Sequence, residues 1–261
     1  MKIGTNELNN IKEFQKDKEL FCPLLLLAQY FESIIYSDMN TYIIGRELPG
    51  YTTWIWTSDN IDDNKLQEII DVLNKYFIDN NKNNYICKKN LYEKLKTKLN
   101  LSDYFEEGFL KCKNIVTLEN ETVNFMKANY GDKTTLSKYW ISYCEEMFNR
   151  KIEFNDSLLE VEDWLEEDKF YVLKDNNNKI VSMAKYKTVD NIAEISHVYT
   201  PNDERGKGYC KTIIYYLTKL LLDSNFIPVL YTDYHYEASN KAYTKVGYNI
   251  EDNLVRFSTQ K

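Results

Sequence analysis

Seven residues late in the sequence combine basic and glycine side chains in a pattern that suits an anion: Arg205-Gly206-Lys207-Gly208-Tyr209-Cys210-Lys211. The preceding residues 192–200 are typical of a β-strand, and 201–204 supply turn chemistry. The following residues repeat apolar side chains at helical spacing, namely Tyr209, Ile213, Leu217, Leu220 and Leu221. The glycines are therefore expected at a helix N-terminus, where backbone N–H groups, the helix dipole and the basic side chains favour a pyrophosphate.

Two common nucleotide-binding loops do not match this stretch. No third glycine completes G-x-G-x-x-G, and no acidic residue ends a second strand about 20 positions later, as a dinucleotide fold requires. The triphosphate loop G-x-x-x-x-G-K-[ST] is absent as well. The remaining pattern is R-x-x-G-x-(G/A), and its structural alternative is an ordinary helix start.

Residues 205–210 resemble the pyrophosphate loop of the GNAT superfamily of acyl-CoA N-acyltransferases, with Cys210 where that family usually has glycine or alanine. A second block, residues 230–233 followed by 238–248, is similar to the family's last strand, short helix and Tyr-x-Lys-x-Gly-Tyr ending. The two blocks occur in the order the family requires. The resemblance covers residues from about 119 to 261 and implies the GNAT fold.

The hydrophobic pattern of residues 119–261 agrees with an α+β fold, in which helices flank a mixed, mostly antiparallel sheet. Expected strands are 121–127, 169–173, 179–188, 191–200, 228–233 and 249–258. Expected helices are 134–147, 156–167, 206–223 and 238–245. Asp156 is the predicted N-cap of the second helix.

Transfer of an acyl group from a thioester to an amine needs a base, an oxyanion donor and an acid that protonates the departing thiolate. By the resemblance, Tyr243, four residues before Gly247, protonates the coenzyme A sulfur; a core tyrosine is the alternative. The backbone N–H groups of Val198, Tyr199 and Thr200 are expected to bind the pantetheine arm and polarise the thioester carbonyl.

The resemblance assigns the cofactor phosphates to the loop, so the expected cofactor-binding residues there are Arg205, Gly206, Lys207, Gly208, Tyr209, Cys210 and Lys211. Family members often have asparagine seven residues before the catalytic tyrosine, but Tyr236 stands there in this sequence. We expect Asn240, three residues before Tyr243, to take over part of that contact.

Glu194 and His197 are the candidate bases, because both lie on the strand that leads into the loop. Their three-residue spacing places them on opposite faces of a regular strand, so that at most one faces a given cleft. Glu194 is the preferred catalytic base. His197 and a water chain remain alternatives.

Two domains are predicted, residues 1–118 and 119–261. The first has strand candidates at 32–36, 41–46 and 51–57, and a helical apolar stripe formed by Leu66, Ile69, Ile70, Leu73, Tyr76 and Phe77. No R-x-x-G-x-G occurs before residue 205. Since some GNAT proteins carry a degenerate first copy, residues 1–118 are expected to be a degenerate GNAT-like domain that shapes the acceptor pocket or an interface.

The composition limits the setting. A net charge of -7 argues against general nucleic-acid binding, and the cysteines, five in number and scattered, indicate reduced thiols in a cytoplasm. The apolar run at 22–28 is too short to span a membrane. Neither histidine has metal-ligand spacing, so no metal is expected.

The sequence thus predicts an N-acetyltransferase that moves the acetyl group of acetyl-CoA to a primary amine of a small molecule or peptide in a ternary complex. The alternative is a catalytically weak CoA-binding or interaction module that keeps the fold. Nucleic acid and membrane are not expected as partners, and a homodimer is left open.

Overall fold

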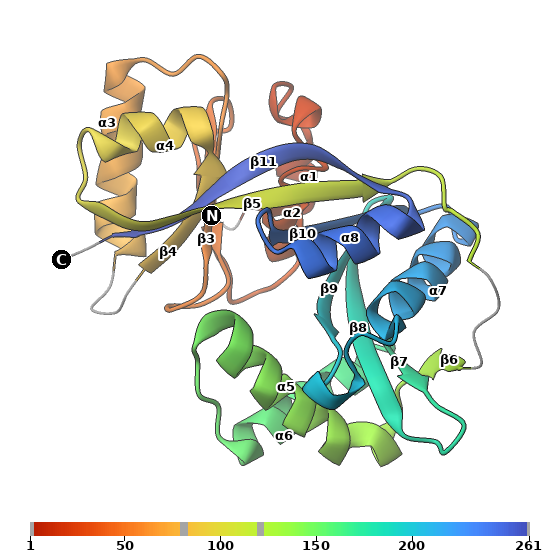
Figure 1. The fold of residues 1–261 in the computed structure, drawn as a ribbon. Helices are drawn as coiled ribbons and strands as arrows, with labels where there is room; N and C mark the ends of the chain where they lie inside the picture. Colours follow the sequence, from red (N-terminus) through yellow and green to blue (C-terminus); the bar gives the residue numbers. More distant parts are fainter. Residues whose placement is uncertain (1–2, 79–82, 119–122, 260–261) are drawn as a thin grey trace. The chain divides into compact units, whose positions relative to one another are not determined.

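The computed structural model describes residues 3–78, 83–118 and 123–259 (Figure 1). Contacts divide the chain into two compact units: unit 1 holds residues 1–109, 231–235 and 250–261, and unit 2 holds 110–230 and 236–249. Three strands change unit along their length, β5 (Leu101–Cys112), β10 (Ile227–Asp233) and β11 (Tyr248–Thr259). The predicted domain boundary at 118/119 adjoins residues 119–122, which lie outside the described residues, and it stays a prediction.

The sheet of unit 1 follows the order β1 (Ile34–Ser37), β2 (Tyr42–Arg46), β3 (Thr53–Thr57), β4 (Asn83–Lys88) and the last residues of β11. The first three strands are antiparallel, β3 and β4 are parallel, and β11 pairs antiparallel with β4 from Leu254 opposite Lys88 to Thr259 opposite Asn83. The strands predicted at 32–36, 41–46 and 51–57 are confirmed, each shortened at its start.

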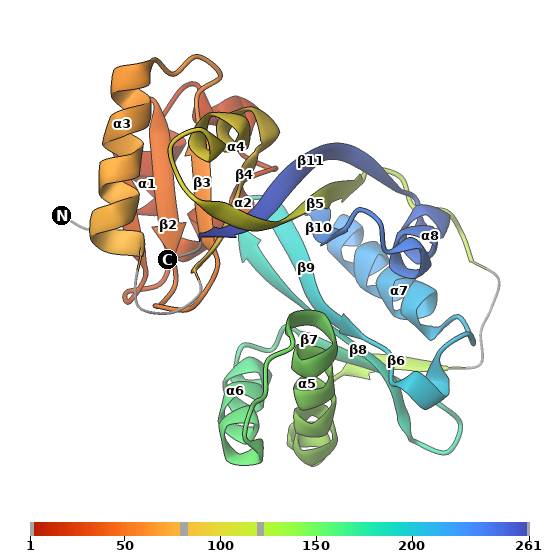
Figure 2. The same cartoon turned by 60° about the vertical axis from the view of Figure 1, so that its left-hand side comes forward.

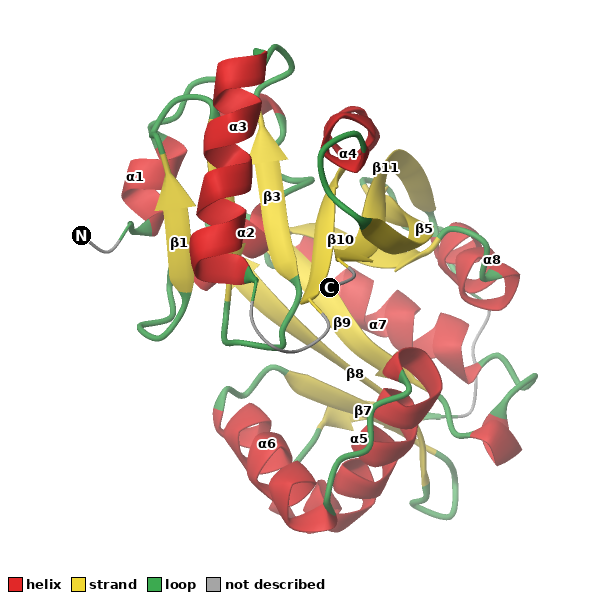
Figure 3. Ribbon diagram, turned by 90° about the vertical axis from the view of Figure 1, so that its left-hand side faces the viewer, coloured by secondary structure: helices red, strands yellow, loops and turns green. Residues whose placement is uncertain are grey.

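Helices cover both faces of this sheet. On one face lie α3 (Asp63–Val72), a π-helical continuation (Leu73–Phe77) and α4 (Lys89–Lys96), whose apolar side chains pack on Ile44 and Ile55 (Figures 2 and 3). On the other face lie α1 (Thr5–Asn9), a 3-10 turn (Phe14–Lys16) and α2 (Cys22–Leu27). Phe14 meets Trp56 edge-to-face with ring centroids 5.2 Å apart.

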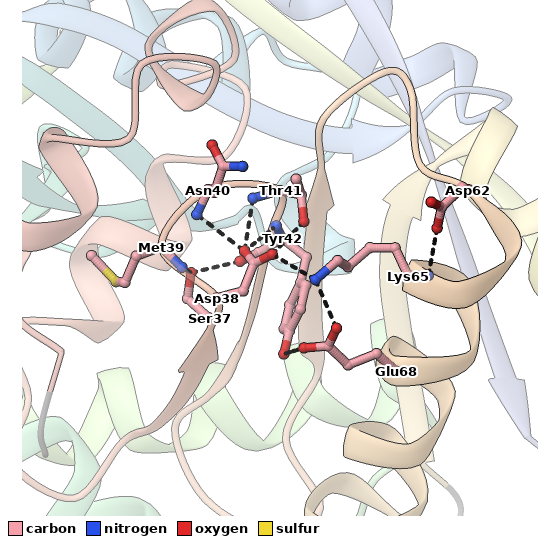
Figure 4. Close-up of polar contacts among 9 residues, drawn as sticks. All are labelled: Ser37, Asp38, Met39, Asn40, Thr41, Tyr42, Asp62, Lys65 and Glu68. Carbon is pink, nitrogen blue, oxygen red and sulfur yellow. Dashed lines mark hydrogen bonds and ion pairs between the residues drawn. The ribbon is translucent and has the colours of Figure 1, made fainter.

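A polar network joins the β1–β2 turn of unit 1 to α3 (Figure 4). The Asp38 carboxylate accepts hydrogen bonds from the backbone N–H groups of Thr41 at 2.7 Å and Tyr42 at 3.1 Å, and lies 3.0 Å from the Lys65 ammonium. Lys65 and the Tyr42 hydroxyl both bond to Glu68. Burial acts to raise the pKa of Asp38, but these hydrogen bonds outweigh it and hold the pKa below its ordinary value.

Unit 2 is built on a second run of strands, β6 (Asn124–Lys127), β7 (Phe170–Lys174), β8 (Ile180–Val189), β9 (Ile192–Tyr199) and the start of β10. The pairs from β6 to β9 are antiparallel, and β9 pairs parallel with β10 from Ile192–Ile227 to Ile195–Leu230. Strands and turns of this kind match the expected α+β fold with a mixed sheet.

Two pairs of helices sandwich the sheet of unit 2 (Figures 1 and 2). On one face α5 (Lys133–Phe148) and α6 (Phe154–Glu166) pack against Phe170 and Val172. On the other α7 (Tyr209–Asp223) and α8 (Glu237–Val246) pack against Tyr171 and Leu173. Successive side chains of β7 therefore belong to two separate cores, because side chains along a strand point alternately to opposite faces of the sheet.

Local boundaries differ from the sequence predictions at three places. The predicted cap of α6 is wrong: the helix begins at Phe154 with Glu153 as N-cap, so Asp156 lies in its first turn. The helix expected from residue 206 begins at Tyr209, because Gly206 and Gly208 adopt left-handed conformations ahead of it. Of the first strand predicted in this half, residues 124–127 form β6, and 121–122 lie outside the described residues.

Candidate acyl-CoA site

The candidate anion site is the start of α7. Gly206 has φ of 78° and Gly208, the N-cap residue, has φ of 86°, a region of backbone space that glycine enters without steric cost. A Cβ on Gly206 would meet nothing within 4 Å, so conformation rather than crowding demands glycine there. No side chain caps the helix. Its first N–H groups and the positive end of its dipole are thus arranged for a phosphate.

Arg205 is held back against the protein. Its Nε donates to the Thr200 carbonyl at 2.9 Å, and its guanidinium forms an ion pair of 2.5 Å with Glu146 at the end of α5. The Tyr199 hydroxyl donates to the same carboxylate at 2.9 Å. Burial and this bond raise the pKa of Tyr199 to about 12. Arg205 therefore ties the loop to α5 and β9.

Lys207 also has a carboxylate partner. It pairs with Glu204 at 2.8 Å, and Lys179, from the turn before β8, pairs with both Glu204 at 2.5 Å and Asp203 at 2.8 Å. These lysines lower the pKa of Glu204. The sequence indicated Arg205, Lys207 and Lys211 as charges for the phosphates, and the structure pairs Arg205 and Lys207 with carboxylates. The backbone N–H groups and the helix dipole at the start of α7 also favour an anion.

Tyr243 lies on α8 with only 7% of its surface exposed. Burial, followed by the nearby Cys210 and Tyr143, raises its pKa well above the ordinary value, so the phenol keeps its proton. Burial likewise raises the pKa of Cys210 to about 11. The structure thus brings the predicted proton donor next to the first turn of α7, to which Cys210 belongs.

Gly247, in the second sequence block, is required for steric reasons. Gly247 ends α8 with φ of 115°, and a Cβ there would lie 2.3 Å from the carbonyl oxygen of Asn114. The neighbouring Val116 N–H donates to the Val246 carbonyl at 2.8 Å. The close approach of these two segments fixes the end of α8, and with it the position of Tyr243 one turn earlier.

A β-bulge in β9 overturns the expected positions of the two candidate bases. Lys185 of β8 pairs with Ser196, and Met183 pairs with Tyr199, so β9 has one extra residue in this interval. His197 has φ of 54°. Its ring lies 4.7 Å from the Trp140 ring of α5. The extra residue therefore turns His197 to the α5–α6 face of the sheet.

Glu194 lies on that same face. Its neighbours Ala193 and Ile195 belong to the core under α7 and α8, so alternation points Glu194 the other way. The prediction that Glu194 and His197 occupy opposite faces is wrong, because the bulge lies between the start of β9 and His197. Which of the two residues acts as the base stays a prediction.

The remaining predicted residues lie around the loop. Val198, Tyr209 and Cys210 pack against the core under α7 and α8. The Thr200 hydroxyl bonds to Ser182 at 3.0 Å, and its carbonyl is the acceptor for Arg205. Lys211 lies in the first turn of α7 and Asn240 in the first half of α8. Their contacts with a cofactor stay predictions.

Sequence reasoning missed Glu146, which anchors both Arg205 and Tyr199. One signal was present, since an acidic residue in the last turn of a helix opposes the helix dipole and calls for a compensating partner. It also missed the ring cluster around His197, formed by Trp140 and Tyr143 of α5 and Trp164 of α6. These rings were recognised as apolar helix faces, but their meeting with β9 depends on the bulge.

The described residues contain neither a metal-binding cluster nor a membrane-spanning helix. No group of three or more His, Cys, Asp or Glu side chains there is placed to hold a metal ion. Within the described ranges, no helix is both long and apolar enough to cross a membrane.

Comparison with known proteins identifies the class of this unit. Residues 136–248 match the model of the acetyltransferase (GNAT) family, and this range includes β9, the loop, α7 and Tyr243. The chain therefore carries a GNAT acetyltransferase domain, a member of a family that transfers acyl groups from CoA thioesters to nitrogen. No curated protein matches the sequence.

Solved structures share the fold over nearly the whole chain. A Drosophila protein has a TM-score of 0.71 at 8% identity, covering 99% of this chain and 97% of its own. A GCN5-related N-acetyltransferase from Kribbella flavida has 0.64 at 8%, covering 97% of both. A GNAT-family acetyltransferase from Colwellia psychrerythraea has 0.61 at 12%, covering 95% and 97%. At such identities the likeness concerns the fold alone.

Proposed function

We propose that unit 2 transfers the acetyl group of acetyl-CoA to a primary amine of a small molecule or peptide, by direct attack in a ternary complex. The observation that carries this proposal is the start of α7: two left-handed glycines lead into a helix that no side chain caps, inside a GNAT domain. The N–H groups that follow Gly206 and Gly208 would receive the pyrophosphate. The protein would work in the cytoplasm.

Tyr243 would complete the transfer by protonating the departing thiolate. Its buried phenol keeps the proton that the sulfur needs, and its neighbour Cys210 belongs to the same helix start that would hold the pyrophosphate. The N–H groups of residues 198–200 would hold the pantetheine arm beside it. This arrangement supports acyl transfer more directly than it supports a module that only binds CoA.

The first experiment is a titration of the whole protein with acetyl-CoA and with CoA, followed by melting curves. A ligand that binds only the folded state raises the melting temperature. A panel of amines then follows, with release of free thiol and the mass of the acylated product as readouts. Binding without transfer to any amine favours the CoA-binding module; absence of any melting shift at saturating acetyl-CoA contradicts the proposal as a whole.

Unit 1 has no assigned chemistry in this proposal. It lacks the R-x-x-G-x-G pattern, and its origin as a degenerate GNAT copy, like a homodimer, remains a prediction. A contribution from unit 1 to acceptor choice would appear as a change in amine preference, with unchanged acetyl-CoA affinity, in unit 1 variants.

A further inference from the structure

His197 combines three unusual features of backbone and side chain. It lies in the bulge of β9, it has a left-handed backbone with φ of 54°, and its ring is enclosed by other rings. The centroids of Trp140 and Trp164 are 4.7 Å and 4.8 Å away, and Tyr143 is stacked at 6.0 Å. Bulges and left-handed non-glycine residues concentrate at functional sites, where they redirect a side chain.

The two ring nitrogens of His197 have different surroundings. Nδ1 is buried and makes no hydrogen bond to any residue that the structure describes. Nε2 likewise has no hydrogen bond in the described part of the chain, and the residue as a whole is partly exposed. A buried polar atom without a partner is rare in proteins and calls for an explanation.

The surroundings also keep the imidazole neutral. Burial is the largest cause, and Lys185 and Lys187 of β8 add to it, so the pKa of His197 is well below its ordinary value. Besides those two lysines, the ionisable groups on the elements packed around the ring include Tyr143 and Cys144 of α5, Glu160 and Glu167 at α6, and Glu194 and Tyr199 of β9. Lys185 is itself balanced by Glu167 at 3.3 Å.

A neutral imidazole has one N–H and one lone pair. Aromatic faces carry negative charge and attract an N–H edge weakly, whereas they repel a lone pair. Trp164 meets the His197 ring edge-to-face at an interplanar angle of 69°. In the tautomer with the proton on the buried Nδ1, the lone pair is on Nε2.

We propose that His197, through the Nε2 lone pair, is the base that takes the proton from the attacking amine. This proposal rests on the proposed acetyl transfer. The amine nitrogen bonds to the thioester carbon, the carbonyl π pair moves to oxygen, and an N–H proton passes to Nε2. The carbonyl then re-forms, the C–S bond breaks, and the sulfur takes the pair and the Tyr243 proton. Solvent returns the proton from His197 to the Tyr243 phenolate, so the products are an amide and CoA thiol.

Position favours His197 over Glu194, the base preferred from sequence. The N–H groups expected to polarise the thioester are those of residues 198–200, and His197 is next to them in the chain. Glu194 lies three residues earlier, roughly 10 Å back along the strand at about 3.3 Å per residue. It sits inside the ladder, opposite Lys187 on one side and Val229 on the other. Tyr143 is near both residues, since its ring stacks with that of His197 and its charge contributes to the raised pKa of Tyr243.

The kinetic test uses substitutions that keep the bulge. Asparagine and glycine both tolerate a left-handed backbone, so His197→Asn and His197→Gly remove the base without adding backbone strain. We expect turnover to fall by about 10² to 10⁴-fold in both, with acetyl-CoA affinity nearly unchanged. Added imidazole should restore part of the turnover of His197→Gly, because the deleted ring leaves a space of its own shape, and should not affect His197→Asn.

The controls separate this role from a structural one. Glu194→Gln tests the competing base, and His235→Asn, in unit 1, controls for loss of a histidine. A loss of turnover confined to Glu194→Gln, or the absence of imidazole rescue in a folded His197→Gly that binds acetyl-CoA, overturns the proposal.

A second test does not depend on a known acceptor. The chain has 2 histidines, so in the His235→Asn variant nitrogen NMR of the labelled imidazole reports His197 alone. The expected spectrum with acetyl-CoA bound is a neutral ring with the proton on Nδ1. A protonated ring, or a proton on Nε2, contradicts the proposal even if transfer occurs. A wild type that binds no acetyl-CoA instead contradicts the proposed function.

Discussion

The starts of α3 in unit 1 and α7 in unit 2 satisfy their free backbone groups in different ways. Asp62 caps α3 by accepting from the Lys65 N–H at 2.7 Å, and Asp63 follows in the first turn (Figure 4). Gly208 precedes α7 without a side-chain cap, and its first turn has no acidic residue. A capped start contributes to stability, whereas an uncapped start keeps its N–H groups for a ligand.

The charged groups beside these two helices follow the same division. In unit 1, Asp38, Lys65 and Glu68 bond to one another and to the local backbone. In unit 2, Glu146 pairs with Arg205 and Glu204 with Lys207, and the start of α7 has no carboxylate of its own. In unit 2 the ion pairs thus hold the loop in place, and the groups proposed to bind the ligand are backbone N–H groups.

The largest expected effect concerns the tyrosines of the two units. Tyr243→Phe should lower turnover by about 10² to 10⁴-fold, since it removes the proton donor and preserves the packing. Tyr42→Phe in unit 1 is the matched control and should leave turnover unchanged. Tyr42 is also buried, and its hydroxyl donates to Glu68 at 3.0 Å. Steady-state kinetics beside an acetyl-CoA titration measure both. Equal loss of turnover and affinity in Tyr243→Phe would reassign this residue to cofactor binding.

The next effect comes from giving α7 the kind of cap that α3 has. Gly208→Asp places a carboxylate at the anion site, where it competes for the N–H groups and repels phosphate. A charged hydrogen bond contributes about 1.5–3 kcal/mol, so CoA affinity should fall by about 10- to 100-fold. Gly208→Ala carries the backbone strain without the charge. Calorimetric titration measures the CoA affinity of both variants. If both lose the same affinity, backbone conformation and not charge decides binding.

A stability effect of about 2 kcal/mol is expected for Asp38→Asn, because the charged acceptor of the network is lost. The pKa of Asp38 in the folded protein lies below its ordinary value. The contribution of Asp38 to stability is therefore complete when the pH is above the ordinary pKa, and it is lost as the pH falls through the folded pKa. Wild type should therefore lose stability between about pH 5 and pH 2 more steeply than the variant. Urea unfolding at a series of pH values measures this; parallel curves would remove Asp38 from the acid response.

The smallest effect is expected for Asp62→Ala, which removes the side-chain cap of α3. The loss should be about 1 kcal/mol of stability, with acetyl-CoA affinity unchanged. Denaturant unfolding and the same titration are sufficient. A change in cofactor affinity would show that the two helix starts are coupled, contrary to the comparison.

The sequence predicted the elements well where a local rule governs them. Strands β1, β2 and β3 of unit 1, the helix after Gly208 and the ending at Gly247 follow from apolar periodicity and from glycine positions whose φ is positive, whereas β4 and β5 were not predicted. The sequence did not show why residue 247 has to be glycine. The structure shows the reason, because the Asn114 carbonyl leaves no room for a Cβ there. Local sequence patterns thus predicted the loop and the helix start that form the candidate site.

Features that depend on distant contacts were not predictable. The bulge at His197 has no sequence signal, and it places His197 on the same face as Glu194 instead of the opposite one. The pair of Arg205 with Glu146 joins residues far apart in the chain. The cap of α6 was misplaced because Asp156 is a better cap residue by type than Glu153, while the helix begins one turn earlier.

The division of β11 between the units has a consequence for synthesis on the ribosome. Residues 254–259 pair with β4, yet they are made only after the whole of residues 110–249. Until then β4 keeps an open edge, the kind of strand edge that invites pairing with other chains. Domains generally fold in the order of their synthesis, but unit 1, although its helices come first, cannot close its sheet first. Folding of the nascent chain should therefore finish in unit 1, where it began, and the edge of β4 stays open to other chains until residues 254–259 have been made.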